Sequence, residues 1–341
     1  MFDYIWKLTD LKQDKKHIKV FSCFSCGGGS TMGYKRAGFD VLGNVEIDYA
    51  INKVYKTNHH PQFNFNMDLR EFNRLDSLPA ELYDLDILDG SPPCSTFSIA
   101  GLREKNWGKA KAFREGQKQQ VLDDLFFVFL ETVKILNPKI VVAENVVGLA
   151  QGQARGYVNQ IIRTFQSLGY YVQLFKLDAA YMDVPSKRER LFFIANRMKY
   201  PPLKLCFNCP VIKFGQVRSL EGLPLKADSK LGKLLARRTK NDHSIKDIML
   251  RFYGKNTHFN DSVISDDRVC NTITASGTFI RMHDGNKFSV HDLITCQSFP
   301  QDFNFCGRSV QYICGMSVPP NMMANIAVEI YNQWLRGNEN E

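Results

Sequence analysis

A cysteine follows two prolines in the segment Asp89–Cys94, directly after an apolar run. The prolines restrict the backbone and hold the Cys94 thiol at one place near the end of the preceding strand. A thiolate held in this way can add to an electrophilic carbon and leave again. Taken alone, however, a cysteine of this kind is more often a buried structural thiol.

A carboxylate stands at a similar position farther along the chain. Glu144 opens the segment Glu144–Val146 and follows the apolar run Ile140–Ala143. A carboxylate at the end of a buried strand is partly desolvated, which favours its protonated form and suits it to general-acid catalysis. The alternative is a carboxylate that caps the next helix.

A glycine-rich segment lies near the N-terminus, where Phe24–Gly29 and then Gly33 follow an apolar run. Glycines there allow a tight turn and a close approach of the backbone to a ligand. Glu46 stands 17 to 19 residues after the three consecutive glycines, where ribose hydroxyls would lie. The spacing is not that of a dinucleotide site, which disfavours NAD. A plain tight turn is the alternative.

These segments need a scaffold, and the first half of the chain alternates short apolar runs with helical patterns. Such alternation predicts a mostly parallel sheet with helices on both faces, and ligands in such sheets bind at the carboxyl ends of the strands. The predicted strands are His17–Phe24, Val41–Glu46, Asp84–Leu88, Ile140–Ala143, Tyr170–Leu177 and Arg190–Ala195, and the clearest helices are Leu122–Leu136 and Asn321–Leu335.

Charge is unevenly distributed along the 341 residues, whose net charge is +9. Residues 199–260 hold 13 Lys and Arg against four acids, so this segment accounts for the whole excess. A neutral body with one basic lobe is typical of a protein that binds a polyanion. A basic surface that only maintains solubility is the alternative.

Composition predicts a cytoplasmic protein. No apolar run approaches the ~20 residues of a membrane span, and Met1–Lys19 lacks the apolar core of a signal peptide. The nine cysteines are scattered, as in a reducing compartment. Two Cys-x-x-Cys pairs, at Cys23 and Cys26 and at Cys206 and Cys209, lack the further ligands that zinc needs. We therefore predict no metal site.

Taken together and in this order, the motifs resemble those of the C5-cytosine DNA methyltransferase family. The resemblance runs from about residue 18 to residue 332. The segments that carry it are Phe24–Gly29, Ser91–Ser98, Glu144–Val146, Val184–Arg190, Thr272–Thr274, Ser298–Pro300 and Gly315–Pro320. Four residues depart from the family pattern, namely Cys26, Ser95, Ser186 and Met316.

The resemblance implies a covalent mechanism. Cys94 would add to C6 of cytosine while Glu144 protonates N3, so that C5 accepts a methyl group from S-adenosylmethionine. Arg190 would bind the cytosine O2 and lower the pKa of the thiol, and Arg188 would support the same site. These four residues are the predicted catalytic set.

The resemblance also assigns a cofactor pocket. Phe24 would pack on the adenine, Glu46 would bind the ribose, and Asp68 would contact the adenine amino group. The predicted cofactor-binding residues are Phe24, Gly27, Gly28, Gly29, Glu46, Ile47, Asp68, Pro92, Ser317 and Val318.

Double-stranded DNA is the implied partner. Because cytosine C5 is inaccessible inside a duplex, the target base must be flipped out. The segment Ile99–Gln120 carries six Lys and Arg and is expected to close over the flipped base, the alternative being a solvated surface loop. The predicted DNA-binding residues are Ser98, Arg103, Lys105, Arg218, Arg237, Arg238, Lys240, Arg251 and Thr272.

We therefore predict an α/β protein, with a Rossmann-like, doubly wound S-adenosylmethionine-dependent methyltransferase domain and a smaller, mostly irregular and β-containing target-recognition domain. The catalytic and cofactor-binding domain would comprise residues 1–198 and 310–341, and the recognition domain residues 199–309. The expected function is cytosine-C5 methylation at a short duplex sequence by a monomer, in a restriction–modification system with a separately encoded endonuclease or as a solitary enzyme. The alternative is a tRNA cytosine-C5 methyltransferase, but that branch carries a Cys-Phe-Thr signature that this sequence lacks.

Overall fold

The computed structural model describes residues 1–11, 16–93, 124–151, 155–256 and 261–336. The chain divides into two compact units. We call one the sheet unit (Lys12–Leu177, Glu189–Leu205 and Ile326–Glu341) and the other the small unit (Met1–Leu11, Asp178–Arg188 and Cys206–Asn325). This division places residues 310–325 with the small unit, whereas the predicted functional domains group them with the catalytic domain. The functional boundaries stay a prediction.

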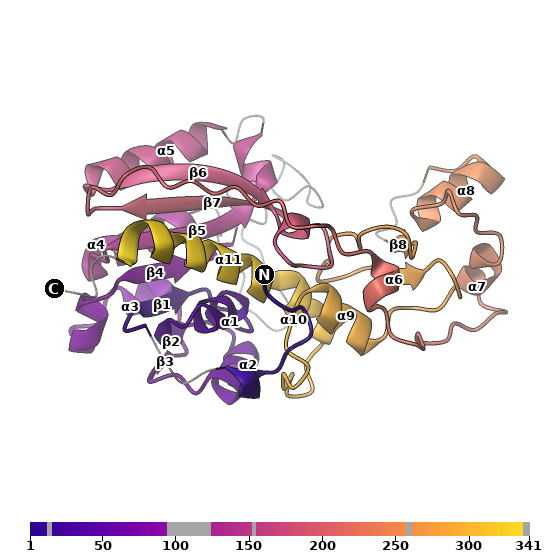
Figure 1. The fold of residues 1–341 in the computed structure, drawn as a ribbon, viewed down its shortest axis with the longest axis horizontal. Helices are drawn as coiled ribbons and strands as arrows, with labels where there is room; N and C mark the ends of the chain where they lie inside the picture. The colour runs from indigo at the N-terminus through magenta and orange to yellow at the C-terminus, as the bar shows by residue number, and fades with distance from the viewer. Residues whose placement is uncertain (12–15, 94–123, 152–154, 257–260, 337–341) are drawn as a thin grey trace. The chain divides into compact units, whose positions relative to one another are not determined.

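A seven-stranded sheet forms the centre of the sheet unit (Figure 1). Its order is β3-β2-β1-β4-β5-β7-β6, with β7 antiparallel to β5. The neighbouring strands among β1 to β5 pair in parallel, which confirms the predicted doubly wound α/β fold. The strands are β1 (Lys19–Cys23), β2 (Asp40–Val45), β3 (Phe63–Phe65), β4 (Ile87–Gly90), β5 (Ile140–Val146), β6 (Tyr171–Asp178) and β7 (Glu189–Asn196). β3 was not predicted, and β5 extends three residues beyond the predicted strand, so Glu144 lies inside it.

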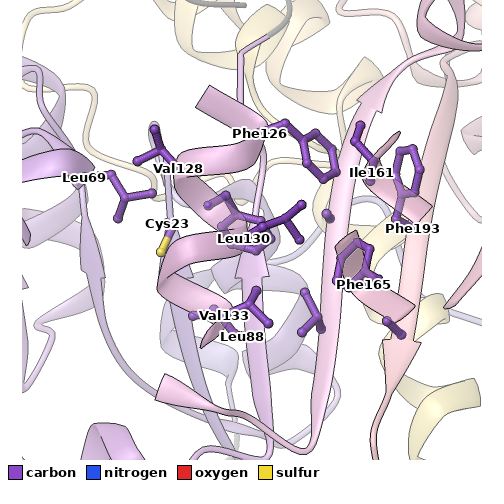
Figure 2. Packing of buried hydrophobic residues seen from close by; sticks show 14 of the residues in the cluster. Cys23, Leu69, Leu88, Phe126, Val128, Leu130, Val133, Ile161, Phe165 and Phe193 are labelled. Atoms are coloured by element: carbon purple, nitrogen blue, oxygen red, sulfur yellow. The ribbon is translucent and has the colours of Figure 1, made fainter. Parts of the chain in front are cut away.

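The sheet buries side chains on both faces, as parallel sheets do. On one face Phe21, Leu88, Val141 and Phe193 pack with the helices α4 (Leu125–Leu136) and α5 (Arg155–Ser167) in the cluster of Figure 2. The alternate strand residues point to the opposite face because the side-chain period of a strand is two. The remaining helices of this unit are α1 (Gly29–Arg36), α2 (Tyr49–His59) and α3 (Leu69–Phe72), with the short 3-10 turns η2 (Ala80–Tyr83) and η3 (Val147–Ala150).

The small unit is built around short elements. The strands β8 (Asp261–Ile264) and β9 (Thr278–Arg281) are parallel, and Val263 and Ile280 pack with residues of α7 and α8. Its helices are α6 (Phe214–Val217), α7 (Lys230–Leu235), α8 (Ile245–Tyr253), α9 (Val290–Cys296) and α10 (Val310–Met316), with the 3-10 turns η1 (Leu8–Asp10) and η5 (Ala179–Tyr181). The helix α11 (Pro320–Ile330) begins in this unit, and its last residues, with the turn η6 (Tyr331–Leu335), belong to the sheet unit.

The predicted irregular, β-containing lobe therefore holds more helix than expected. The ends of α8 show why it forms, because the Ser244 side chain accepts a hydrogen bond from Asp247 N at its start and Gly254 ends it with a φ of 62°. Throughout the described ranges, no helix combines the length and the apolar character that crossing a bilayer demands.

Candidate active site

Glu144 on β5 and Arg190 on the neighbouring strand β7 form an ion pair. β5 and β7 pair with Glu144 opposite Phe192, so Arg190, two residues away, points to the same face. Arg190 Nε lies 2.8 Å from Glu144 Oε1, and the two side chains are 15% and 12% exposed. Glu144 Oε1 is therefore engaged by the Arg190 guanidinium in an ion pair that lacks hydrogen-bond geometry. This contact holds the carboxylate in place on β5.

The glycine-rich turn between β1 and α1 has an unusual backbone. Phe24 and Cys26 have φ values of 54° and 46°, and Gly28 has a φ of 86°. Cys26 thus occupies the left-handed region that favours glycine, at the position where the family pattern has glycine. Gly28 is required for a second reason, because a Cβ there would lie 2.2 Å from His59 Nε2.

His59 supports this turn from the end of α2. Its Nε2 lies 3.0 Å from the Gly27 carbonyl oxygen. Burial lowers the pKa of His59 to about 3, with Lys35 adding to the shift. The ring is therefore neutral near pH 7, and Nε2 carries the proton because a carbonyl oxygen can only accept. Sequence analysis did not identify this residue.

Glu46 joins the turn to the second strand. Its carboxylate accepts hydrogen bonds from Cys26 N at 2.9 Å and from Asp48 N at 3.0 Å. Burial raises the pKa of Glu46, while these backbone donors act in the opposite direction. The carboxylate is thus held in place at the carboxyl end of β2, where the prediction places the ribose.

A cluster of asparagine side chains forms hydrogen bonds to the glycine-rich turn, and sequence analysis did not predict it. Asn44 donates to Ser25 Oγ at 2.9 Å and to Asn52 Oδ1 at 3.1 Å. Asn64 donates to Asn44 Oδ1 at 2.7 Å, and Asn52 donates back to Asn64 at 3.0 Å. These bonds fix Ser25 and with it the start of the turn. Isolated asparagines in the sequence give no signal for such a contact.

The other predicted residues of the sheet unit have differing surroundings. Asp68 caps α3 by accepting from Arg70 N and also forms an ion pair with the Arg70 side chain at 3.2 Å. Ile47 is 44% exposed. Pro92 is buried, and its carbonyl oxygen accepts from Asn145 Nδ2 at 3.0 Å. That bond ties the start of the Pro-Pro-Cys segment to β5.

Several predicted residues lie outside the described part of the chain. They are Cys94, Ser98, Arg103 and Lys105, with the segment Ile99–Gln120 and the departure at Ser95.

Arg188 lies in the small unit and is 2% exposed. Its guanidinium donates to Gly315 O at 3.0 Å, and its backbone N–H donates to Asp178 Oδ1 at 3.0 Å. The segment around Gly315 is tightly packed, because a Cβ at Gly315 would lie 2.4 Å from Ala275 N. Arg188 therefore fixes the segment that leads to Ser317 and Val318.

Ser317 and Val318 are both 3% exposed. Ser317 Oγ has no hydrogen-bond partner among the described residues. A buried hydroxyl without a partner is costly, and a polar ligand would relieve that cost.

Four of the predicted DNA-contacting arginines have partners inside the protein, and one of them, Arg237, donates to Tyr253 Oη at 3.2 Å. Arg218 pairs with Asp266 at 2.9 Å, and Arg251 pairs with Asp242 at 2.6 Å. Arg238 donates to the carbonyl oxygens of Leu235, Met282 and His283. The side chains of Arg218, Arg238 and Arg251 hold the small unit together, so a contact with bases would compete with internal bonds.

Arg237 and Lys240 are exposed. Thr272 donates from its hydroxyl to Lys187 O at 2.8 Å.

An aromatic surface at the end of α8 was not predicted. Phe252 and Tyr253 are 44% and 52% exposed. The guanidinium carbons of Arg251 and Arg237 lie 4.6 and 5.1 Å from the centre of the Phe252 ring. Arginine stacked on an exposed ring can bind phosphate or bases. Sequence analysis did not identify these aromatic residues, because helix α8 was not predicted.

No three His, Cys, Asp or Glu side chains in the described ranges are arranged to hold a metal ion.

The sheet order, the glycine-rich turn and the acid at the end of β2 define a Rossmann-like, S-adenosylmethionine-dependent methyltransferase fold. Solved structures share it: a DNA modification methyltransferase encoded within an Escherichia coli prophage aligns with a TM-score of 0.65 at 21% identity, over 93% of this chain and 99% of that one. Spodoptera frugiperda DNMT2 aligns with a TM-score of 0.61 at 18% identity, over 92% of this chain and 99% of that one.

Residues 18–332 match the family described as C-5 cytosine-specific DNA methylase, and the chain belongs to this family of DNA (cytosine-5-)-methyltransferases. The type II methyltransferase M.NgoPII of Neisseria gonorrhoeae is 25% identical, over 92% of this chain and 95% of that protein. The type II methyltransferase M.FnuDI of Fusobacterium nucleatum is 33% identical over 53% of this chain, and the match spans about half of that protein, 47%.

Proposed function

We propose that the protein transfers a methyl group from S-adenosylmethionine to C5 of cytosine in a short specific sequence of double-stranded DNA. The observation that carries this proposal is the shielded Glu144–Arg190 pair on β5 and β7, beside the tethered segment that leads to Cys94. The resemblance of the motifs implies that a carboxyl group, a guanidinium and a thiol together activate the cytosine ring.

The residues of the sheet unit fit the cofactor. The backbone at Gly28 leaves no room for a Cβ, and the Glu46 carboxylate is fixed by two backbone donors. We propose that S-adenosylmethionine is held by Phe24, Gly27, Gly28, Gly29, Glu46, Ile47, Asp68, Pro92, Ser317 and Val318. When bound, S-adenosylmethionine supplies an electrophilic methyl group for C5.

The protein residues prepare the base for that transfer. The Cys94 thiolate adds to C6 while Glu144 gives a proton to N3, so the ring becomes an enamine with electron density at C5. Arg190 orients Glu144 and donates to the cytosine O2. After methylation, loss of the C5 proton to a base, departure of the Cys94 thiolate and return of the N3 proton to Glu144 give neutral 5-methylcytosine.

DNA binding is assigned to the basic lobe. Residues 199–260 carry the excess of positive charge, and the exposed Arg237 and Lys240 are suited to phosphate contacts. The target base would flip out of the duplex. We further propose a cytoplasmic monomer whose catalytic domain comprises residues 1–198 and 310–341, with residues 199–309 for recognition.

The biological setting is proposed from the relatives. They include type II methyltransferases and an orphan methyltransferase, M.SPRI of Bacillus phage SPR. We propose that this chain is the modification enzyme of a restriction–modification system, with a separately encoded endonuclease, or a solitary counterpart.

The experiment that tests the function follows labelled methyl groups from S-adenosylmethionine into duplex DNA and into total tRNA, with bisulfite sequencing of the products. Wild type and Cys94→Ala are compared. Label in DNA at one short motif, absent with the variant, supports the proposal. Label in tRNA alone supports the tRNA alternative, and no transfer to either substrate refutes both.

A further inference from the structure

A buried carboxylate in the sheet unit has no role in the mechanism above. Asp89 is 2% exposed and lies in β4, five residues before Cys94. It pairs in register with Ser22 of β1 and with Val142 of β5. Glu144, two residues beyond Val142, therefore points to the same face of the sheet as Asp89.

Hydrogen bonds connect Asp89 to the strand β1 and to the helix α1. Ser22 Oγ donates to Asp89 Oδ2 at 2.8 Å, and Tyr34 Oη donates to Asp89 Oδ1 at 3.2 Å. Ser30 of α1 contributes a further side-chain hydrogen bond. Ser30 and Tyr34 belong to the helix that starts at the glycine-rich turn, so this carboxylate ties that helix to the strand that leads to Cys94.

Titratable and polar groups of four other elements interact with Asp89. They are Ser22 and Cys23 of β1, Ser30 and Tyr34 of α1, Tyr55 of α2 and Glu144 of β5. Burial raises the pKa of Asp89 to about 7, while the bonds from Ser22 and Tyr34 lower it and the charge of Glu144 raises it. Burial likewise raises the pKa values of Cys23, Tyr34 and Tyr55, so these three groups stay neutral near pH 7.

We infer that Asp89 is a positioning residue whose carboxylate form is required for full methyl transfer, an inference that rests on the proposed function. The Asp89 carboxylate accepts hydrogen bonds from the Ser22 and Tyr34 hydroxyls, and protonation of Asp89 removes one acceptor position from this network. The ionised form of Asp89, which keeps both acceptor oxygens, is therefore the active one.

The consequence is a pH dependence with a defined midpoint. A carboxyl group with a pKa of about 7 passes from about one-tenth to about nine-tenths ionised between pH 6 and pH 8. If activity follows the ionised form, the rate of methyl transfer rises about ninefold over this range. Asp89→Asn is neutral at every pH, so it should keep the low rate of the wild type at pH 6 and show no rise with a midpoint near pH 7.

Asp86→Asn is the matched control, because Asp86 precedes β4 at its other end. It pairs with Lys139 at 2.7 Å and accepts from Lys19 N, so its loss also removes buried bonds of the same strand. It should keep the wild-type pH profile. Tyr34→Phe gives a second test if Asp89→Asn folds poorly, because loss of this donor should move the midpoint to higher pH.

The experiment measures kcat for methyl transfer and the calorimetric affinity for S-adenosylmethionine at pH 6, 7 and 8, with thermal unfolding of each variant. A flat profile for Asp89→Asn, together with an upward shift for Tyr34→Phe, is the expected result. A wild-type profile in both variants would overturn the inference and leave the proposed function intact. If the wild type transfers no methyl at any pH, the proposed function fails, and the inference that rests on it fails with it.

Discussion

Replacement of Gly28 by alanine should weaken both folding and cofactor binding, because two costs add at this position. The left-handed φ of 86° costs a residue with a Cβ about 1–2 kcal/mol. The new Cβ would also lie 2.2 Å from His59 Nε2, so the ring must move and its bond to Gly27 O breaks. An unmade buried hydrogen bond costs about 1–3 kcal/mol. The sum is about 2–5 kcal/mol of unfolding free energy.

The assay is urea unfolding at pH 7, with calorimetric titration of S-adenosylmethionine beside it. Gly156→Ala is the control, because Gly156 lies exposed in α5 and a Cβ there meets nothing within 4 Å. It should be neutral or stabilising by about 0.5–1 kcal/mol. In a His59→Ala background, Gly28→Ala should cost less, since only the backbone strain remains. Equal effects of Gly28→Ala and Gly156→Ala, or no relief in the double variant, would refute the reasoning.

Three more predictions follow from the site. Arg190→Gln should lower the rate of methyl transfer by about 10²-fold or more and leave the cofactor affinity unchanged, because Glu144 loses the cation that orients it. An unchanged rate in a single-turnover assay would contradict this prediction. The pKa of His59 is lowered to about 3 in the folded protein, so the neutral ring stabilises the fold above the unfolded value near 6.5, and this contribution is lost as pH falls towards 3. The free energy of unfolding should fall by about 2 kcal/mol from pH 6.5 to pH 5. Urea unfolding should show this loss in the wild type and a smaller loss in His59→Gln, and equal losses in the two proteins would disprove it. Phe252→Ala should raise the KM for DNA about 5- to 160-fold, the effect of losing about 1–3 kcal/mol, and leave the affinity for S-adenosylmethionine unchanged. An unchanged KM would exclude this surface from DNA binding.

Much of the sheet could be predicted, because buried parallel strands appear as apolar runs in the sequence. The runs at Ile140–Ala143 and at Arg190–Ala195 predicted β5 and β7. The contact between Glu144 and Arg190 could not be derived from them, since it depends on antiparallel register across a gap of more than 40 residues.

The supporting residues of the site were missed for a similar reason. His59 meets a carbonyl 32 positions away, and Asn64 meets an amide 20 positions away. A single histidine or asparagine has no periodic pattern that would announce such a contact. Asp89 was quoted only as part of a motif, because its burial by β1, α1 and β5 is a property of the assembled sheet.

In the basic lobe, the charge of the sequence does not identify which acidic side chain pairs with each basic one. The sequence identified the excess of Lys and Arg, but the acids that engage them lie at a distance, as Asp266 does for Arg218. Helices α7 and α8 were missed because frequent lysines and arginines obscure their apolar positions. Leu235, Ile245 and Ile248 nevertheless form the core that these helices share with β8 and β9.

The covalent step at Cys94 is the central claim, and a duplex with 5-fluorocytosine at the target position tests it most directly. Fluorine cannot leave C5 as a proton does, so elimination of the cysteine is blocked once methylation has occurred. The account predicts a complex of protein and DNA that survives denaturation, requires S-adenosylmethionine, maps to Cys94 by peptide analysis and is absent with Cys94→Ser. Methylated cytosine without a trapped complex, or a complex attached to another residue, would contradict the account.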